Sequence, residues 1–432
     1  MKSSPRVLER ACSVMRNSRP WRPSFVDHST PMMCSFSRGA SHSSTSRGMQ
    51  WPTATRLQDL HDLGLHPGER RKHAQFLHGE LQTRFTHSLQ ELESLPHGLS
   101  QRRHVQKVIR CYEDILRTLE ELPTPSSDLQ DREFVDALKN ALCEDGDTVG
   151  NLVASLRELG DDMGLTYRRA QPEVDAAVER FLRLHISQRF LANHYIEPTF
   201  SRSGRLGAFQ LQCHLGEVAR GAADQCISLC KSQLGAAPRI IIDDESSQRA
   251  MASKAHVHYI LTEIFKNALR AVVENWGEEC RQSGKPLPAI KCEITQDDAE
   301  ATLKISDMGG GIAQTRMDDI WKYSFSTSRR CDDDRKPASA MSGYGVGLPM
   351  SRLYARYFGG DLAICSVSGV GTDVYYRLSF RGTELENLPQ QEPQAAKSPI
   401  VFTLPPWLLS KSSWPLSTLR QVRAVTGFAT RR

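Results

Sequence analysis

The stretch SGYGVGLPMSRLYARYFGG, residues 342–360, decides which fold is expected. Its first half alternates glycines with larger residues, and a run with helical spacing follows from Pro349. Glycines let a backbone approach a ligand closely, and a helix that begins after them points its unpaired N–H groups at that ligand. Because such groups attract anions, the stretch predicts a phosphate-binding loop followed by a helix.

Around this stretch the sequence alternates between strands and helices. RIIID at 239–243 and AIKCEITQDDAEATLKISD at 289–307 predict strands, as does LAICSVSGVGTDVYYRLSF at 362–380. Residues 255–276 have the period of a long amphipathic helix. Helices mixed with mostly antiparallel strands predict an α/β sandwich in this half of the chain.

The preceding region has the apolar periodicity of helices alone. From about residue 70 to residue 235 apolar residues recur with a period near 3.6, and breaks at Pro96 and Pro123 separate the helices. Long amphipathic helices joined by short polar loops predict an up-and-down bundle. The expected fold class is therefore α+β, with an all-α helical bundle ahead of the α/β sandwich.

Composition limits the classes of function. The chain has 432 residues and a formal net charge of +5, and its first 56 residues hold nine Lys and Arg against Glu9 and Asp27. The remainder is close to neutral, so nucleic-acid binding has no electrostatic support. An Arg-rich, Ser-rich, acid-poor opening is typical of a mitochondrial transit peptide, and equally of a basic disordered terminus. We expect no membrane span, because no run approaches ~20 apolar residues.

The eleven cysteines do not form a metal-binding pattern. No CxxC pair occurs, and Cys226 and Cys230, one helical turn apart, suit a buried helix face as well as a ligand pair. We expect free thiols and no zinc site.

Two further motifs carry candidate chemistry. In the helix around residue 265, Glu263, Asn267 and Arg270 share one face, which is either a solvated surface or a site for hydrated Mg²⁺ and an attacking group. Asp307 ends a strand and precedes three glycines, which suits either a simple turn or a carboxylate that accepts a hydrogen bond from an amino group such as that of adenine. The polar stretch 324–342 fits a lid over a nucleotide. No Rossmann, P-loop or HRD/DFG kinase signature accompanies these motifs.

The order of these motifs along the chain resembles that of a known ATP-binding fold. EIFKNALRA, DMGGGI, YSFST, GYGVGL and GVGTD follow one another as in the GHKL (Bergerat) ATP-binding fold of histidine kinases, Hsp90, MutL and gyrase. Within that group GYGVGLPMSRLYARYFGGDL and FKNALRAVVE resemble the mitochondrial α-ketoacid dehydrogenase kinases, which act on pyruvate or branched-chain dehydrogenase. ELQTRFTHSLQELESLPHGLS and RFLANHY extend the resemblance into the helical half, so that it covers roughly residues 56–382.

The resemblance implies a homodimeric protein serine kinase that uses ATP and Mg²⁺, acts on the E1α subunit in the mitochondrial matrix, and docks on the E2 lipoyl domain. It implies that Glu263 is the general base and that Asn267 is the Mg²⁺ ligand. The nucleotide contacts that it implies are Glu263, Lys266, Asn267, Arg270, Asp307, Gly309, Gly311, Ser326, Thr327, Gly343, Tyr344, Gly345, Val346, Gly347, Leu348 and Thr372.

The expected domain limits follow from both lines of reasoning. We expect a transit or disordered segment at 1–55, a regulatory and docking bundle at 56–235, the ATP-binding kinase domain at 236–385, and a linker with a tail at 386–432. The tail lacks the Asp-Trp pair by which family members often tie two subunits together. Pyruvate and branched-chain substrates both remain open.

Two other functions are alternatives. A two-component histidine kinase has the same ATP fold, and its phospho-acceptor would be His61 in HDLGLHP, although the proline there comes one place late. A catalytically idle scaffold on the E2 core is the other alternative, and the presence of Glu263, Asn267 and Asp307 argues against it.

Overall fold

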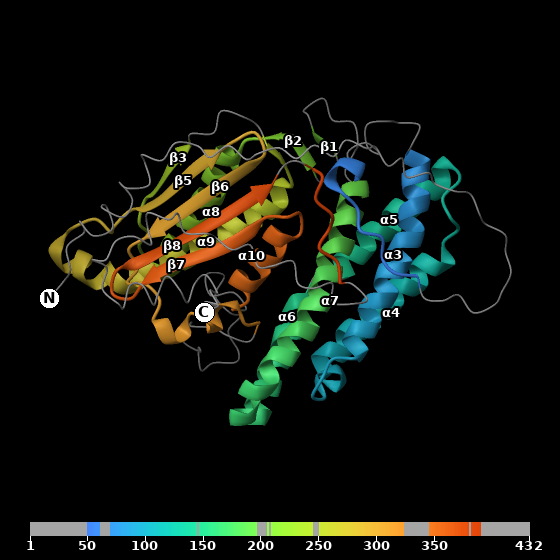
Figure 1. Ribbon diagram of the computed structural model, residues 1–432, viewed down its shortest axis with the longest axis horizontal. Helices are drawn as coiled ribbons and strands as arrows, with labels where there is room; N and C mark the ends of the chain where they lie inside the picture. The colour runs from blue at the N-terminus through green and yellow to red at the C-terminus, as the bar shows by residue number, and fades with distance from the viewer. Residues whose placement is uncertain are drawn as a thin grey trace, which may run out of the picture. The chain divides into compact units, whose positions relative to one another are not determined.

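The computed structural model of this protein describes residues 50–60, 70–144, 147–196, 205–206, 209–244, 250–323, 345–379 and 382–389 (Figure 1). Within these ranges the first half is helical, as its apolar period predicts. The long helices are α3 (Arg70–Glu93), α4 (Arg103–Glu121), α5 (Asp128–Glu144), α6 (Thr148–Met163) and α7 (Tyr167–Ile196). Helix α3 packs on α4 and α7, while α4 also packs on α6 and α5 on α7. The predicted helical bundle is confirmed.

The second half is built on a five-stranded sheet in the order β3-β5-β6-β8-β7. Its strands are β3 (Ile240–Asp244), β5 (Ile290–Gln296), β6 (Glu300–Asp307), β7 (Asp361–Val367) and β8 (Gly371–Ser379). All neighbours are antiparallel except β3 and β5, which are parallel. A smaller sheet, which the sequence did not indicate, joins β1 (Arg205–Leu206), β2 (Phe209–Cys213) and β4 (Ala250–Ala252).

Three helices cover one face of the large sheet. They are α8 (Leu215–Leu234), α9 (Lys254–Ser283) and α10 (Gly347–Arg356). In β6 buried and partly buried residues alternate, so Leu303 and Ile305 enter the core below α9. The predicted two-layer α+β architecture is therefore confirmed.

Helix α9 carries most of the predicted site and has defined ends. The Ser253 side chain accepts a hydrogen bond from the His256 N–H at 3.4 Å at its N-terminus. Gly284, with φ of 65°, ends it in a left-handed conformation that glycine adopts without strain. The helix is longer than the predicted 255–276, because its last two turns carry the polar residues of an exposed helix end.

Two predictions about organisation are corrected by the packing. The period assigned α8 to the bundle, but Val218 and Cys226 of α8 lie in the core beneath the large sheet. Amphipathicity shows that a helix buries one face, not which partner covers it. The composition after residue 385 predicted a linker, yet Glu386 and Leu388 are buried. The other predicted domain limits stay predictions.

The core of the bundle also takes in residues from the second half of the chain. Tyr323, Val346, Met350, Leu353 and Tyr357 pack among the apolar residues of the bundle helices. Consequently the segments on either side of residues 324–344 both contact the bundle.

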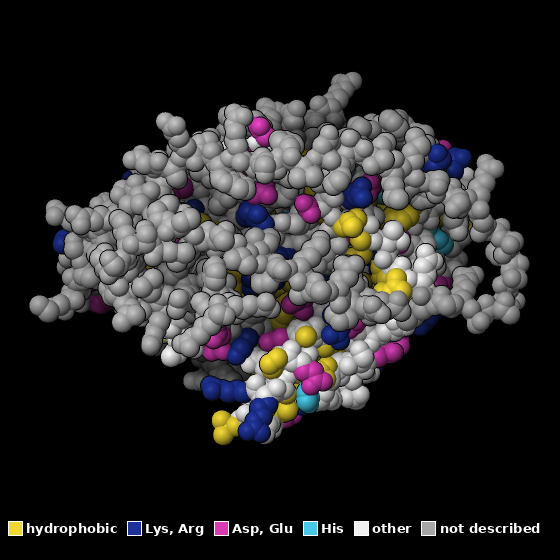
Figure 2. Space-filling model, in the orientation of Figure 1, with side chains coloured by type: hydrophobic (Ala, Val, Ile, Leu, Met, Phe, Trp, Pro, Cys, Tyr) yellow, Lys and Arg dark blue, Asp and Glu magenta, His cyan; other side chains and the backbone are white. Residues whose placement is uncertain are grey.

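The described surface has mixed character. On the face shown in Figure 2, acidic and basic side chains are interspersed, and hydrophobic and basic side chains lie together at the tip where α6 meets α7. Leu165 is 91% exposed there. None of the described helices is both long and apolar enough to cross a membrane.

Candidate active site

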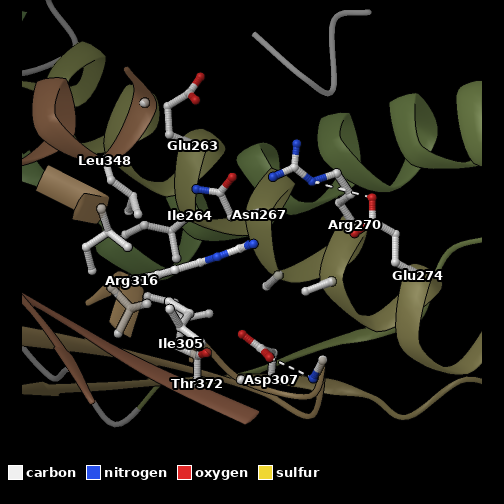
Figure 3. Close-up of a pocket in the computed structure, with 18 of the residues that line it drawn as sticks. Glu263, Ile264, Asn267, Arg270, Glu274, Ile305, Asp307, Arg316, Leu348 and Thr372 are labelled. Carbon is white, nitrogen blue, oxygen red and sulfur yellow. Dashed lines mark hydrogen bonds and ion pairs between the residues drawn. The ribbon is translucent and has the colours of Figure 1, made fainter. Parts of the chain in front are cut away.

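A cavity of about 540 Å³ lies between α9, the end of β6 with its glycine loop, the N-terminus of α10, and β8 (Figure 3). Ten of the residues predicted to bind a nucleotide line it: Glu263, Asn267, Arg270, Asp307, Gly309, Gly311, Gly345, Gly347, Leu348 and Thr372. Motifs that are far apart in the sequence thus meet around one space.

Helix α9 presents its polar face to this cavity. Glu263, Asn267, Arg270 and Glu274 recur at four, three and four residues and all line the cavity. The Glu263 and Arg270 side chains are only 17% and 16% exposed. The alternative of a solvated surface face is therefore wrong for Glu263 and Arg270, whereas the Glu274 side chain, at the rim of the cavity, is 67% exposed.

Lys266 has a different position from the one predicted. It does not line the cavity, and its Nζ atom lies 2.5 Å from Glu263 Oε1. Both side chains are largely buried. Lys266 therefore holds and balances the Glu263 carboxylate rather than reaching the cavity itself.

The other oxygen of Glu263 lies against the start of α10. A Cβ atom placed on Gly347 would come within 2.2 Å of Glu263 Oε2, so any larger residue there would displace this carboxylate. Gly347 and Leu348 are the first residues of α10, and both line the cavity. The first N–H groups of a helix have no partner within the helix, so the α10 N-terminus favours an anion at this end.

The Val346 side chain does not line the cavity, unlike the other described residues of its motif. Its side chain is buried beside Leu152 and Val153 of α6 and Val178 of α7, outside the cavity. Alternating small and large residues in the stretch at 342–348 indicated backbone approach to a ligand, but the larger residue serves packing instead.

Asp307 lies at the opposite end of the cavity, on the sheet. Its carboxylate accepts hydrogen bonds from the backbone N–H groups of Gly309, at 2.8 Å, and Thr372. Burial raises the pKa of Asp307 to about 6, although these two donors oppose the shift. Asp307 and Thr372 are direct partners in the β6–β8 ladder. A buried carboxylate with oxygen capacity to spare suits a neutral N–H donor.

The glycine loop after Asp307 is held close to its neighbours. Gly311 has φ of 68°, and a Cβ atom there would lie 2.2 Å from the Val367 carbonyl oxygen. The Trp276 indole N–H of α9 donates to the Met308 carbonyl at 2.7 Å. The Asp307 end of the cavity is therefore fixed by both α9 and the β7–β8 turn.

Several residues of the cavity were not predicted. Asn275, Ser368 and Arg316 are polar members of this group, and Ile305 and Val374 supply an apolar wall from the sheet. Strand alternation indicates that Ile305 and Val374 face α9, but Arg316 follows the glycine loop without any periodic signal. Figure 3 shows its side chain extending into the cavity toward Asn267.

Some predictions lie outside the described residues. These are the assignments of Ser326, Thr327, Gly343 and Tyr344 to the nucleotide site and of His61 to phospho-transfer. The described part of the chain contains no group of three or more His, Cys, Asp or Glu side chains able to hold a metal ion. The assignment of Mg²⁺ to Asn267 stays a prediction.

Comparisons with known proteins agree with this geometry. Residues 252–382 match the family model of the histidine kinase-, DNA gyrase B-, and HSP90-like ATPases, which is the class that the sandwich and its cavity define. Residues 54–207 match the model described as mitochondrial branched-chain alpha-ketoacid dehydrogenase kinase.

Relatives extend the similarity over most of the chain. A mitochondrial [pyruvate dehydrogenase (acetyl-transferring)] kinase from Arabidopsis thaliana is 33% identical over 355 residues, which is 79% of this chain and 94% of the relative. The Drosophila melanogaster kinase is 29% identical over 78% of this chain and 84% of its own length. The human isozyme 3 is 28% identical over 78% and 86%. This chain belongs to the family of mitochondrial α-ketoacid dehydrogenase kinases.

Proposed function

We propose that this protein is an ATP-dependent protein serine kinase that phosphorylates the E1α subunit of a mitochondrial α-ketoacid dehydrogenase complex and thereby inhibits it. One observation carries the proposal: Glu263 and Asn267, one turn apart on α9, face the N-terminus of α10 at one end of a cavity whose other end holds Asp307. Family membership supplies the reaction class.

The two ends of the cavity suit the two ends of ATP. The Asp307 carboxylate accepts a hydrogen bond from the adenine amino group, while Ile305 and Val374 contact one flat face of the base. The phosphates extend toward the N-terminus of α10, where Gly345 and Gly347 allow close approach of the backbone. This direction brings the terminal phosphate to the Glu263 end.

Glu263 is then placed to act as the general base. Its carboxylate accepts the proton of the substrate serine hydroxyl as the serine oxygen attacks the terminal phosphorus, and the bond to the bridging oxygen breaks to release ADP. Lys266, 2.5 Å from the other side of the carboxylate, keeps Glu263 oriented. Phosphoryl transfer needs mainly positioning and charge neutralisation, which these groups supply.

The oxygen donors present fit Mg²⁺. Magnesium that arrives with nucleotide phosphates uses only one or two protein oxygens, and the Asn267 amide and the Glu263 carboxylate line the cavity together. When bound, Mg²⁺ neutralises charge on the phosphate oxygens. Asn267 would hold it, and Arg270 would lie beside the same phosphates.

The remaining parts of the proposal rest on the family. Relatives are named mitochondrial, which together with the basic N-terminus supports a mitochondrial protein that acts in the matrix. A homodimer and docking on the E2 lipoyl domain are proposed on the same ground. Curated relatives named as pyruvate dehydrogenase kinases favour pyruvate dehydrogenase E1α as substrate, and the branched-chain E1α is the competitor.

Transfer of radiolabel from γ-labelled ATP tests the function. The full chain would be offered pyruvate and branched-chain E1α separately, each with and without its E2 core. We expect acid-stable label on serine of one E1α, retained by a Glu278→Gln variant whose exposed carboxylate lies on α9 outside the cavity. Glu263→Gln should keep ATP binding and lose most transfer, and Asn267→Ala should lose binding of Mg·ATP. Acid-labile label on the chain itself, with neither E1α marked, would instead indicate a histidine kinase.

A further inference from the structure

The charges that line the cavity are unequally paired. Its carboxylates are Glu263, Glu274 and Asp307, and its cations are Arg270 and Arg316. Lys266 pairs with Glu263, and Arg270 Nε lies 3.9 Å from Glu274 Oε1. Among the described residues, no hydrogen bond or ion pair involves the Arg316 side chain. The cavity that we propose for the anionic nucleotide thus contains one guanidinium, that of Arg316, whose donors have no partner among the described residues.

The backbone of Arg316 is held in place. It ends the short helix η4 (Gln314–Arg316), where its backbone N–H donates to the Ala313 carbonyl at 2.8 Å. The following Met317 and Ile320 are buried in the core beneath the sheet and hold the segment in place. Only the side chain of Arg316 is therefore free to adjust, and in Figure 3 it points into the cavity toward Asn267.

We propose that Arg316 binds the α- or β-phosphate of the nucleotide, an inference that rests on the proposed function. A guanidinium has donors only, so it cannot accept the adenine amino proton that Asp307 accepts. Its planar fork matches two phosphate oxygens, and its charge offsets theirs.

The position of Arg316 in the cavity indicates which phosphates of the nucleotide it contacts. In Figure 3 its guanidinium lies between Asn267 and Asp307, whereas Glu263 and Gly347 mark the end where the terminal phosphate reacts. The phosphates in between are those that ADP keeps. Arg316 therefore binds substrate and product alike, and it raises nucleotide affinity more than the rate of transfer.

Nucleotide binding by the full chain tests this assignment. Affinities for adenosine, ADP and ATP would be measured by isothermal titration calorimetry for the wild type, Arg316→Gln and Arg316→Lys. A hydrogen-bonded charge pair is worth about tenfold to a hundredfold in affinity. We expect that loss for ADP and ATP in Arg316→Gln, partial recovery in Arg316→Lys, and unchanged adenosine affinity. The KM for ATP should rise with a smaller change in kcat.

Arg281→Gln is the matched control. Like Arg316→Gln, it removes one positive charge. Arg281 lies on α9, is 76% exposed and pairs with Glu278 away from the cavity. Equal losses for adenosine and ADP in Arg316→Gln, or no loss for either, would overturn the phosphate assignment. A wild-type chain that binds neither ADP nor ATP would overturn the proposed function together with it, whereas wild-type binding that Arg316→Gln leaves intact overturns the role of Arg316 alone.

Discussion

Arg84 and Glu386 form a two-point ion pair although 302 residues separate them in the sequence. Arg84 Nη1 and Nη2 lie 3.0 and 2.8 Å from the two oxygens of Glu386, and both side chains are fully buried. Thr55 and the Tyr357 hydroxyl also donate to Glu386. Helix α3, the segment before it, the end of α10 and the segment after β8 therefore meet at one carboxylate.

We expect Glu386→Gln to lower the free energy of unfolding by about 3–5 kcal/mol, because it leaves the buried Arg84 charge without its main partner. Urea denaturation followed by circular dichroism would measure the change. Glu278→Gln removes a carboxylate from an exposed pair with Arg281 and should change stability by less than about 1 kcal/mol. Similar small effects of both variants would show that Glu386 contributes little.

Gly347→Ala tests the contact between α10 and the proposed base. The added Cβ would lie 2.2 Å from Glu263 Oε2, and the carboxylate must move because it is the flexible partner. We expect transfer to fall at least about tenfold while adenosine binding and melting temperature stay near wild type. Gly221→Ala is the control, since a Cβ there on α8 meets nothing within 4 Å. Full transfer by Gly347→Ala would show that the position of the Glu263 carboxylate does not matter for transfer, which contradicts its role as the general base.

Adenosine affinity should depend on the ionisation of Asp307. Burial raises the pKa of this carboxyl to about 6, so the acceptor form predominates above that pH and the protonated form below it. Affinity should be constant near neutral pH and fall by up to about tenfold per pH unit below about pH 6. Titration with adenosine avoids the ionisation of phosphates. Asp307→Asn should bind weakly at every pH, and a wild-type affinity that stays flat down to about pH 5 would contradict the assignment.

Asp175 on α7 should make stability depend on pH in the opposite sense to most carboxylates. Burial raises its pKa to about 6, with Glu179 adding to the shift while the Tyr323 N–H and Lys322 oppose it. The ionised form is the one that folding disfavours, so the stability linked to this group is present at low pH and lost as pH rises through about 6. We expect Asp175→Asn to raise the melting temperature at about pH 7.5 and to have less effect at about pH 5.

The control for Asp175→Asn is Asp114→Asn, on the exposed side of α4. It should leave the melting temperature unchanged at both pH values. A destabilising effect of Asp175→Asn at neutral pH would mean that the carboxylate gains more from Lys322 and the Tyr323 N–H than it loses by burial.

The parts of the site that lie within regular elements were predictable from the sequence. The spacing of Glu263, Asn267 and Arg270 put them on one face of α9, and the resemblance supplied the reason why that face is covered. Asp307 was recognisable because it joins a strand to three glycines. The α+β division followed from a change of period near residue 236.

Long-range partners were not predictable in the same way. Nothing near Arg84 or Glu386 in the sequence indicates that they pair, since each is an ordinary charged residue of a polar stretch. Val346 sits between glycines that indicate a ligand, but its side chain is packed against α6 and α7. Arg316 belongs to a single turn of helix, which is too short for any periodic pattern.

The sharing of one core between the two halves has a consequence for synthesis. The bundle helices end at Ile196, but Val346, Met350, Leu353 and Tyr357 complete their core. A chain emerging from the ribosome therefore holds an unfinished bundle, with apolar surface exposed, until about 160 more residues have been made. The bundle helices are thus completed late, although they precede the sheet in the sequence. A chain that ends before α10 would be a target for chaperones and proteases and would not function as an independent bundle.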